Sequence, residues 1–493
     1  MKIAISYPPI TSEKGIPLLS QNRQFQYFHA PTYIYPVVPA YAATLLKEAG
    51  HDVAWVDGIA GENKYGEWLK NIEQVKPDVM MIETKTPTVK RHWTIIDDVK
   101  EVSQDTKVVL VGDHVTYLAR ESMEHSKADY VLEGGDYDFL FLNLVQYLDD
   151  GKVLEPGIWF RDDGEIKNTG RFQLNHDVNS LPFIDRDLTR WRLYSEKNGN
   201  FKSTPGTYTM VGRDCWWRNN GGCTFCSWPT LYPNYRVRKP ELLVEEIGML
   251  IENQGVKEVF DDTGTFPIGS WLKRFSQLMI EGGYNERIRF SCNMRFGVLS
   301  RDDYRLLRKA GFRMLLFGLE SGNQYTLGRL NKGIRIEDAI RECKVARQEG
   351  LEPHITVMVG YPWERHEDAL KTSKMAKELI ENGWASTLQS TVVIPYPGTK
   401  LYDEAKEEGW FRVDPFDYDR FDMTEPVLET VDMTPEEVMG VCDEIYKVFL
   451  SPKYMLRHLL HIRSWRDVKY SFKGIAKVIG HVKDFGRKRE NRQ

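Results

Sequence analysis

The chain has 493 residues, a hydrophobic content of 41% and a formal net charge of −5. This length exceeds what one hydrophobic core usually supports, so we expect two or three domains. We expect no membrane-spanning helix and no signal peptide, because the sequence has no apolar run of about 18 residues and opens on a strand pattern. Six cysteines without a regular framework spacing favour a reducing compartment, so a cytoplasmic protein is expected.

The first 150 residues alternate between strand and helix patterns. Such alternation predicts an α/β domain, a parallel sheet with helices on both faces, over residues 1–150. No G-x-G-x-x-G motif follows the first strand, so a dinucleotide site is unsupported. The predicted strands are 2–7, 51–56, 78–82, 107–111 and 129–132, and the predicted helices are 39–47, 88–103, 116–123 and 137–149.

Polar and glycine residues follow several of these strands. Ligands of such sheets bind beyond the carboxyl ends of the strands, so these residues indicate a broad site for a large planar or polar ligand. A domain that only docks and binds nothing remains the alternative. The strand ends are Tyr7-Pro8-Pro9, Glu83 to Thr86, Gly112-Asp113-His114 and Glu133-Gly134-Gly135.

Residues 151–204 are predicted to connect two domains. The segment 158–166 has a β-hairpin pattern with an Asp163-Gly164 turn. The turn-rich segment 179–188 then leads to the second domain.

Residues 205–425 repeat the strand–helix alternation and predict a partial or complete (β/α) barrel. Pro240 suits the first turn of a helix expected over 241–252. Barrel enzymes carry their chemistry at the carboxyl ends of the strands, where this sequence has polar residues. The predicted strands are 207–211, 256–260, 287–291, 314–318, 354–359 and 391–394.

Three cysteines, Cys215, Cys223 and Cys226, lie close together after the first of these strands. Three thiolates can hold three corners of a [4Fe–4S] cluster and leave the fourth iron open to a small molecule. A structural zinc site is the alternative, but it needs four protein ligands. Between Cys226 and Cys292 the sequence has neither Cys nor His, which favours the cluster.

The C-terminal segment is basic. Residues 451–493 carry twelve Lys and Arg against three Asp and Glu, a net charge of +9. We predict a basic helical domain over 426–493. Its basic side either faces solvent or attracts a membrane surface, an anionic partner or a phosphorylated substrate.

These motifs together resemble the radical S-adenosylmethionine superfamily, and the N-terminal half resembles its subgroup with an appended cobalamin-binding domain. The family usually places three and two residues between its cysteines, whereas this chain has seven and two. The motifs are the cysteine loop, Tyr235 to Glu241, Asp261-Asp262-Thr263, Gly318 to Gly322, Val359 to Glu364 and Pro395 to Thr399, with Pro39-Ala40-Tyr41, Leu45-Leu46, Gly50 to Asp52 and Asp57-Gly58 in the N-terminal half.

The resemblance implies a six-stranded partial barrel that binds a [4Fe–4S] cluster and S-adenosylmethionine. Cys215, Cys223 and Cys226 would ligate three irons, and the amino and carboxylate groups of S-adenosylmethionine would bind the fourth. Phe225 would lie near the adenine, although core packing is an equal alternative. Asp261, Asp262 and Thr263 would hold the methionine amino group, and Asn293, Arg295 and Glu320 would contact the ribose or carboxylate. A rim salt bridge is the alternative for Glu320.

The resemblance also implies a Rossmann-like domain that binds cobalamin. The D-x-H-x-x-G motif of some mutases is absent, so we expect cobalt without a histidine from that motif below it. Thr84, Thr86, Gly112, Asp113, His114, Glu133, Gly134 and Gly135 would touch the corrin or its nucleotide tail.

The implied activity is radical methylation of an unactivated sp3 carbon, with Tyr396 as a catalytic candidate and Tyr361, Trp363 and Gln389 as further candidates to line the cavity. The substrate could be a small molecule, a lipid or a protein side chain such as a glutamine of methyl-coenzyme M reductase. An alternative is rearrangement or ring modification of a hopanoid-type or tetrapyrrole substrate without methyl transfer, and a non-enzymatic metal-binding module is a third. A flavodoxin or ferredoxin would donate electrons. We expect no nucleic-acid partner, and peripheral membrane contact only through the basic C-terminus.

Overall fold

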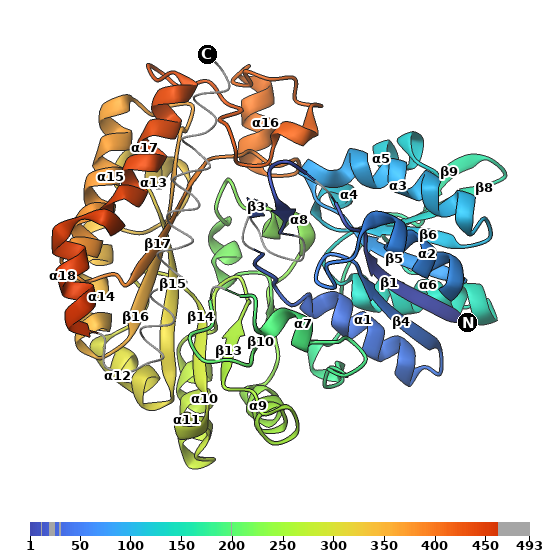
Figure 1. Ribbon diagram of the computed structural model, residues 1–493, viewed down its shortest axis with the longest axis horizontal. Coiled ribbons are helices and arrows are strands. Elements are labelled where there is room, and N and C mark those ends of the chain that lie inside the picture. The colour runs from blue at the N-terminus through green and yellow to red at the C-terminus, as the bar shows by residue number, and fades with distance from the viewer. Residues whose placement is uncertain (11, 19–24, 29–30, 199, 462–493) are drawn as a thin grey trace.

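The computed structural model describes residues 1–10, 12–18, 25–28, 31–198 and 200–461 (Figure 1). It contains two α/β units, one built on a seven-stranded sheet and one on a six-stranded sheet. The basic segment beyond residue 461, predicted to be helical, lies outside the described residues.

The seven-stranded sheet belongs to the N-terminal half. Its five strands β4, β1, β5, β6 and β7 run parallel in that order, and the predicted hairpin extends the same sheet as β8 and β9, antiparallel to β7. The bounds are β1 Lys2–Tyr7, β4 Asp52–Asp57, β5 Val79–Glu83, β6 Lys107–Val111, β7 Tyr130–Leu132, β8 Ile158–Asp162 and β9 Glu165–Asn168.

Helices cover both faces of this sheet, as the alternation predicts. The central strand β5 is buried along its whole length, because neither of its faces meets solvent. The predicted helix 116–123 is wrong in its bounds: two shorter helices replace it, because Leu118 leaves the helical conformation between them. The helices are α1 Val37–Glu48, α2 Tyr65–Val75, α3 Val89–Val102, α4 Asp113–Tyr117, α5 Ala119–His125 and α6 Tyr137–Asp150.

The six-stranded sheet has the order β10-β13-β14-β15-β16-β17, and every neighbouring pair is parallel. The last strand spans Thr387–Val392 and not 391–394, because the inward-facing Gln389 gives its first half a polar sequence that hides the strand. The other bounds are β10 Gly206–Thr209, β13 Glu258–Asp261, β14 Arg289–Met294, β15 Phe312–Glu320 and β16 Glu352–Val359.

Helices lie outside this sheet and leave its concave side for the site (Figure 1). Helix α9 begins at Pro240, as predicted, and ends before Gly255, which has a φ of 68°. The outer helices are α9 Pro240–Gln254, α10 Ser270–Glu281, α11 Tyr284–Arg287, α12 Arg301–Lys309, α14 Ile336–Gln348, α15 His366–Glu381, α17 Pro435–Lys447 and α18 Pro452–His461. None of the helices in the described ranges is long and apolar enough to cross a membrane.

Buried charged contacts join the two units. Arg213 Nη2 donates to Asp138 Oδ2 at 2.5 Å, with 2% and 0% of the two side chains exposed. Arg238 Nη1 donates to the Tyr41 hydroxyl at 2.8 Å. Separating a buried ion pair from its partner costs several kcal/mol, so the segment that carries the cysteines is held firmly against the N-terminal unit.

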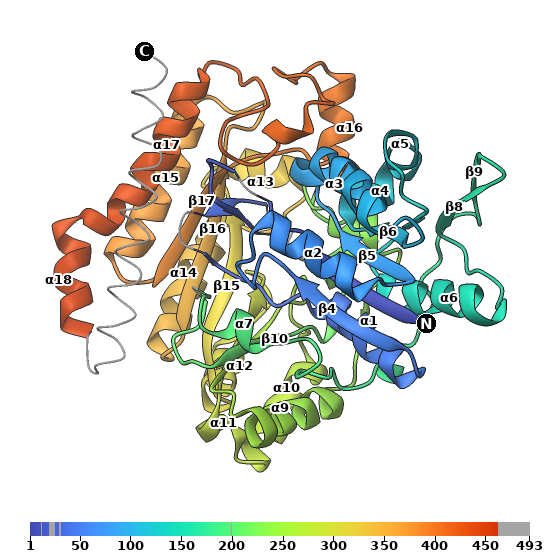
Figure 2. The same ribbon diagram turned by 45° about the vertical axis from the view of Figure 1, so that its right-hand side comes forward.

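The chain between β1 and α1 also reaches the barrel. It forms the short strands β2 (Ile16–Pro17) and β3 (Tyr27–Phe28), which lie near β17 in Figure 2. Gln389 Nε2 of β17 lies 3.2 Å from Gln26 Oε1. This segment therefore places residues of the N-terminal unit beside the interior of the barrel.

Candidate functional site

The cysteine loop follows β10. The short strand β11 (Gly212–Arg213) leads into it and pairs with β12 (Arg236–Val237) on the way out, so both ends of the loop are fixed. Cys215, Cys223 and Cys226 form no disulfide, are all partly exposed, and all three line one cavity. Within the described ranges, no three His, Cys, Asp or Glu side chains converge on a single metal-ion position.

The seven-residue insert folds as a compact turn. Residues Trp216–Asn220 form a 3₁₀ helix, and Gly221 and Gly222 follow with φ of 90° and 69°, values that glycine adopts at little cost. The Asn331 amide donates to the carbonyls of Asn220 at 2.8 Å and Gly222 at 2.7 Å. The longer gap between the first two cysteines is thus absorbed by a loop that Asn331 holds closed.

The cavity has a volume of about 200 Å³ and extends from the carboxyl ends of the barrel strands into the interior of the barrel. Ile34 of the N-terminal segment lines it as well, so the two halves of the chain share it. The predicted site residues that line it are Cys215, Cys223, Phe225, Cys226, Asp262, Asn293, Arg295, Glu320, Gln389 and Tyr396.

Asp261 and Thr263 support the site from behind. The Val211 N–H and the Thr209 hydroxyl donate to Asp261 Oδ2, both at 2.9 Å. The Gly212 N–H donates to Thr263 Oγ1 at 2.8 Å. Both side chains are buried, and they fix the backbone that leads into the cysteine loop.

Asp262 is the member of this triplet that reaches the cavity. Asn293 Nδ2 donates to Asp262 Oδ1 at 3.3 Å and to the carbonyl of Thr263 at 3.0 Å. The pair presents a carboxylate and an amide on the wall formed by β13 and β14, which suits an ammonium or hydroxyl group of a ligand.

Glu320, at the end of the neighbouring strand β15, forms an ion pair with Lys332 in the cavity wall. Lys332 Nζ lies 2.8 Å from Glu320 Oε1, and both side chains are about 90% or more buried. The same ammonium lies 5.8 Å from the ring centre of Phe225. Glu320 has a φ of 67° at a β-bulge that begins after Gly318, a conformation that a non-glycine residue adopts only at a cost.

Arg295, at the end of β14, places a cation beside the cysteines. Its guanidinium stacks on Trp217, with Cζ 3.7 Å from the ring centre. Burial lowers the pKa of Arg295, whereas the thiolates of Cys223 and Cys215 act in the opposite direction. Arg295 Nη2 is buried and has no hydrogen-bond partner within the described part of the chain.

The deep end of the cavity is polar and uncharged. His354 Nδ1 lies 2.8 Å from Thr387 Oγ1, and burial lowers the pKa of His354 to about 4, so the imidazole is neutral at pH 7. Asn200 Nδ2 donates to the Tyr208 hydroxyl at 3.0 Å. These groups give a ligand neutral hydrogen-bonding partners inside the barrel.

Tyr396 lies between the barrel and the N-terminal unit. Burial and the carboxylates of Asp113 and Asp422 raise the pKa of Tyr396, so its hydroxyl keeps its proton. Tyr361 and Trp363, which were also expected to line the cavity, instead stack on each other and lie outside its lining.

The predicted cobalamin residues gather at the carboxyl ends of β5, β6 and β7. His114 Nδ1 lies 3.1 Å from Thr86 Oγ1, its Nε2 lies 3.8 Å from Glu121 Oε2, and its ring meets Tyr418 edge-on. Burial lowers the pKa of His114 to about 3. His92 Nδ1 likewise lies 2.7 Å from the hydroxyl oxygen of Thr84.

The remaining residues of this group make structural contacts. Asp113 pairs with Lys85 at 3.3 Å, and Glu133 accepts a hydrogen bond from Trp159 at 2.6 Å. A Cβ at Gly135 would lie 2.1 Å from the Tyr232 ring, so this glycine permits the close approach of the cysteine-bearing segment. A Cβ at Gly112 would meet the Thr84 carbonyl at 2.3 Å and one at Gly134 would meet Leu174 at 2.8 Å.

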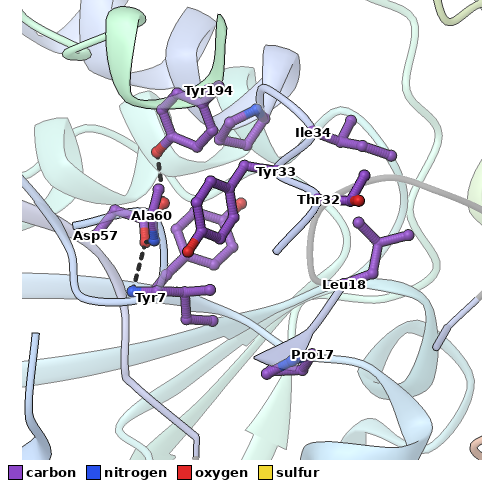
Figure 3. Close-up of a pocket in the computed structure, with 11 residues that line it drawn as sticks. Tyr7, Pro17, Leu18, Thr32, Tyr33, Ile34, Asp57, Ala60 and Tyr194 are labelled. Atoms are coloured by element: carbon purple, nitrogen blue, oxygen red, sulfur yellow. Dashed lines mark hydrogen bonds between the residues drawn. The ribbon is translucent and has the colours of Figure 1, made fainter. Parts of the chain in front are cut away.

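A second, much smaller pocket of about 20 Å³ lies at the ends of β1 and β4 (Figure 3). Asp57 accepts hydrogen bonds there from the Tyr194 hydroxyl and from the Ile59 and Ala60 N–H groups. Burial raises the pKa of Asp57 to about 6. Ile34 lines both this pocket and the large cavity.

Comparison with known proteins agrees with this architecture. Residues 211–376 match the Radical SAM superfamily, and residues 28–138 match the B12 binding domain. The uncharacterized methyltransferase PH0819 of Pyrococcus horikoshii is 24% identical over 90% of this chain and 94% of its own length. The anaerobic magnesium-protoporphyrin IX monomethyl ester cyclase of Cereibacter sphaeroides is 25% identical over 88% of this chain and 69% of its own length.

The fold also matches a solved structure. The radical S-adenosylmethionine methyltransferase TsrM of Kitasatospora setae, with a tryptophan substrate and a S-adenosylmethionine analogue bound, superimposes with a TM-score of 0.69 at 15% identity. The match covers 92% of this chain and 89% of TsrM.

A corrinoid-type α/β domain and a barrel with three cysteines at its rim together define a radical enzyme that combines cluster chemistry with cobalamin. The chain carries a radical S-adenosylmethionine domain and a B12 binding domain, and it resembles a methyltransferase over most of its length. Its cofactors are a [4Fe–4S] cluster, S-adenosylmethionine and cobalamin. The three thiols around one cavity and the buried, unpartnered guanidinium nitrogen of Arg295 among the described residues fit the cluster and an anionic ligand.

Sequence reasoning missed several residues of the cavity wall. Lys332, Trp217, His354, Asn200 and Tyr208 all line it. Lys332 follows a helix and not a strand, and His354 and Tyr208 lie within strands rather than at their ends. The position of Trp217 in the unusual insert was the available signal for that residue.

Proposed function

We propose that this enzyme transfers a methyl group to an unactivated sp3 carbon of a substrate held between its two domains. The observation that carries the proposal is one cavity lined both by the three cysteines and by Ile34 of the N-terminal half. When bound, the cluster with S-adenosylmethionine supplies a carbon-centred radical and cobalamin supplies the methyl group. The methyltransferase names of PH0819 and TsrM support this reaction class.

The residues of the chain would bind S-adenosylmethionine at the rim. Cys215, Cys223 and Cys226 would hold the cluster. Asp262 with Asn293 would accept the amino group or the ribose, and Arg295 would take the carboxylate, because its buried Nη2 has no partner in the described ranges. Phe225 would pack against the adenine.

The deeper part of the cavity would hold the substrate. His354 and Gln389 offer neutral polar groups there, and Met358 and Ile394 offer apolar surface. A substrate with an uncharged polar group next to an aliphatic carbon fits this lining best. A glutamine side chain, a small molecule or part of a lipid can each carry such a group. The search for the substrate therefore starts from this polar group and its neighbouring carbon, and not from the size of the molecule.

Tyr396 would stand at the boundary between the substrate and cobalamin. Its protonated hydroxyl is buried between the domains and can orient a substrate carbonyl or hydroxyl. His114 would stay a structural residue, since its ring is buried, packs against Tyr418 and contacts Thr86 through Nδ1.

The test is anaerobic reconstitution with iron, sulfide and cobalamin, followed by incubation with S-adenosylmethionine that carries a deuterated methyl group and with a metabolite or protein extract. Methylation predicts 5′-deoxyadenosine and S-adenosylhomocysteine together, and a deuterated methyl group in the product. Deoxyadenosine alone would show a rearrangement instead. A C215A/C223A/C226A variant should lose both iron and S-adenosylmethionine cleavage, and retention of either would refute the assignment.

A further inference from the structure

The seven-residue insert between Cys215 and Cys223 carries two tryptophans, and one of them points back into the cavity. Trp217 lines the cavity together with the three cysteines, whereas Trp216 does not. The two rings meet edge-on, 6.1 Å apart. The insert therefore does more than lengthen the loop, because it adds an aromatic wall beside the cluster cysteines.

Contacts of its side chain and of its backbone hold Trp217 in place. Its indole N–H donates to the carbonyl of Asn331 at 2.7 Å. Gly333 lies directly behind it, and a Cβ there would be 2.3 Å from the ring. The carbonyl of Trp217 lies 3.3 Å from the Gly222 N–H, which closes the turn before Cys223.

Arg295 stacks on the same ring, and its Nη2 would lie 3.2 Å from a Cβ at Gly333. The guanidinium carbon lies 3.7 Å from the ring centre, close enough for a strong cation–π contact. Only 4% of Arg295 is exposed, and this residue lines the cavity with Cys215 and Cys223. Nη2 is left without a hydrogen-bond partner among the residues the structure describes.

We propose that the insert is a positioning element: Trp217 holds the Arg295 cation beside Cys223 and Cys215, where it raises the reduction potential of the cluster and strengthens binding of the S-adenosylmethionine carboxylate. The inference rests on the proposed function, because it requires the cluster and S-adenosylmethionine at this site. Trp217 acts through Arg295 and does not itself take part in the reaction.

The positive charge of Arg295 explains the expected effect on the reduction potential. Reduction adds one negative charge to the cluster, and a fixed cation next to its sulfur ligands stabilises the reduced form. A guanidinium without a stacking partner would rotate among several rotamers and lose this effect. The desolvated cavity leaves the charge poorly screened, so its position matters more than it would in water.

The test compares W217F, W217L and R295Q in the reconstituted holoenzyme. W217F keeps an aromatic face under the guanidinium, whereas W217L keeps apolar volume without it, and both lose the indole N–H. The measurements are iron content, the midpoint potential of the cluster by EPR-monitored titration without S-adenosylmethionine, and the Kd of S-adenosylmethionine.

We expect R295Q to shift the potential to more negative values and to weaken S-adenosylmethionine binding roughly tenfold, as loss of a charge-assisted hydrogen bond does. W217L should shift the potential and the Kd in the same direction as R295Q does, whereas both values for W217F should stay near those of the wild type. In the R295Q background, W217L should change the potential and the Kd little further. This non-additivity is what a positioning role requires.

An R295Q potential equal to that of the wild type overturns the proposal, whatever the tryptophan variants do. A W217L effect that adds fully to R295Q, or that W217F reproduces, overturns the role of Trp217. R295Q leaves the contacts of Trp217 with Asn331 and Gly333 in place, so it remains informative if W217L loses iron. A wild-type protein that binds no cluster would instead refute the proposed function.

Discussion

Lys332 Nζ lies 2.8 Å from Glu320 Oε1, and both residues line the same cavity as Asp262 and Asn293. The pair brings no net charge to a site whose thiolates and ligand carboxylate are anionic. Lys332 therefore compensates a buried carboxylate that would otherwise stand unpaired beside the thiolates and the ligand carboxylate, because buried charges are poorly screened.

We predict that K332Q weakens S-adenosylmethionine binding more than E320Q does. K332Q leaves the Glu320 carboxylate uncompensated next to anionic groups, whereas E320Q leaves an extra cation. The expected increase in Kd for K332Q is about tenfold or more, as for loss of one buried charged partner. Equilibrium binding to the reconstituted protein, followed by the EPR signal of the reduced cluster, measures it.

The double variant K332Q/E320Q is the control for this prediction. It removes both charges and should recover part of the affinity that K332Q loses. If the double variant binds S-adenosylmethionine as weakly as K332Q, or if E320Q is the weaker binder, the compensation argument is wrong.

Gly264 should be required for loading of the cluster. A Cβ at this position would lie 2.9 Å from the carbonyl of Asp214 and 3.0 Å from Cys215 Cβ, so the cysteine loop would have to move. We expect G264A to lower the iron content after reconstitution and to cost about 1–3 kcal/mol in stability, the usual cost of overpacking. Iron and sulfide analysis together with a urea titration measures both effects.

Gly440 provides the matched control. It lies within α17, and a Cβ there would meet nothing within 4 Å. G440A should therefore keep full iron content and raise stability by about 0.5–1 kcal/mol, the usual gain for alanine in a helix. Equal iron contents in G264A and G440A would contradict the packing argument.

His114 should not bind cobalt. Its Nδ1 contacts Thr86 Oγ1, its Nε2 points toward Glu121 without a hydrogen bond among the described residues, and the buried ring packs edge-on against Tyr418. In the cob(II)alamin form of the holoenzyme, we expect the EPR spectrum to be unchanged when all histidines are labelled with ¹⁵N. A change in nitrogen hyperfine splitting would show that a histidine is a ligand and that this part of the chain rearranges when cobalamin binds.

The sequence predicts most of the architecture because local patterns set it. The alternation of strands and helices and the start of α9 at Pro240 follow from periodicity and helix-start preferences. The parallel strands of the N-terminal sheet and the six parallel strands of the barrel agree with this alternation. β17 was misplaced because the cavity requires a polar Gln389 where a buried strand would normally be apolar.

The sequence predicts only part of the candidate site, because some of its residues come together only when the chain folds. Asp262, Asn293 and Glu320 lie at strand ends, where a sequence pattern can find them. Trp217 and Arg295 are 78 residues apart, and only folding of the insert brings them into contact. Asp261 and Thr263 share the motif of Asp262, but their side chains bind the backbone that leads into the cysteine loop and do not line the cavity.

The linker should make stability depend on pH through His176. Burial lowers the pKa of His176, but hydrogen bonds to Asp136 and Glu155 outweigh it and raise the pKa to about 9. The unfolded value is about 6.5, so this histidine stabilises the folded state fully below pH 6.5. That contribution, at most about 3 kcal/mol, is lost as the pH rises through 9.

H176Q is the variant that isolates this effect, since glutamine can keep a hydrogen bond but carries no proton to lose. The free energy of unfolding of the wild type should fall relative to that of H176Q between pH 6.5 and pH 9.5, as measured from urea midpoints at each pH. Asp136 keeps its contact with Arg236 at 2.5 Å in both proteins, so the comparison reports on the histidine alone. Parallel pH profiles for the two proteins would show that His176 gains no proton affinity from its two carboxylate neighbours.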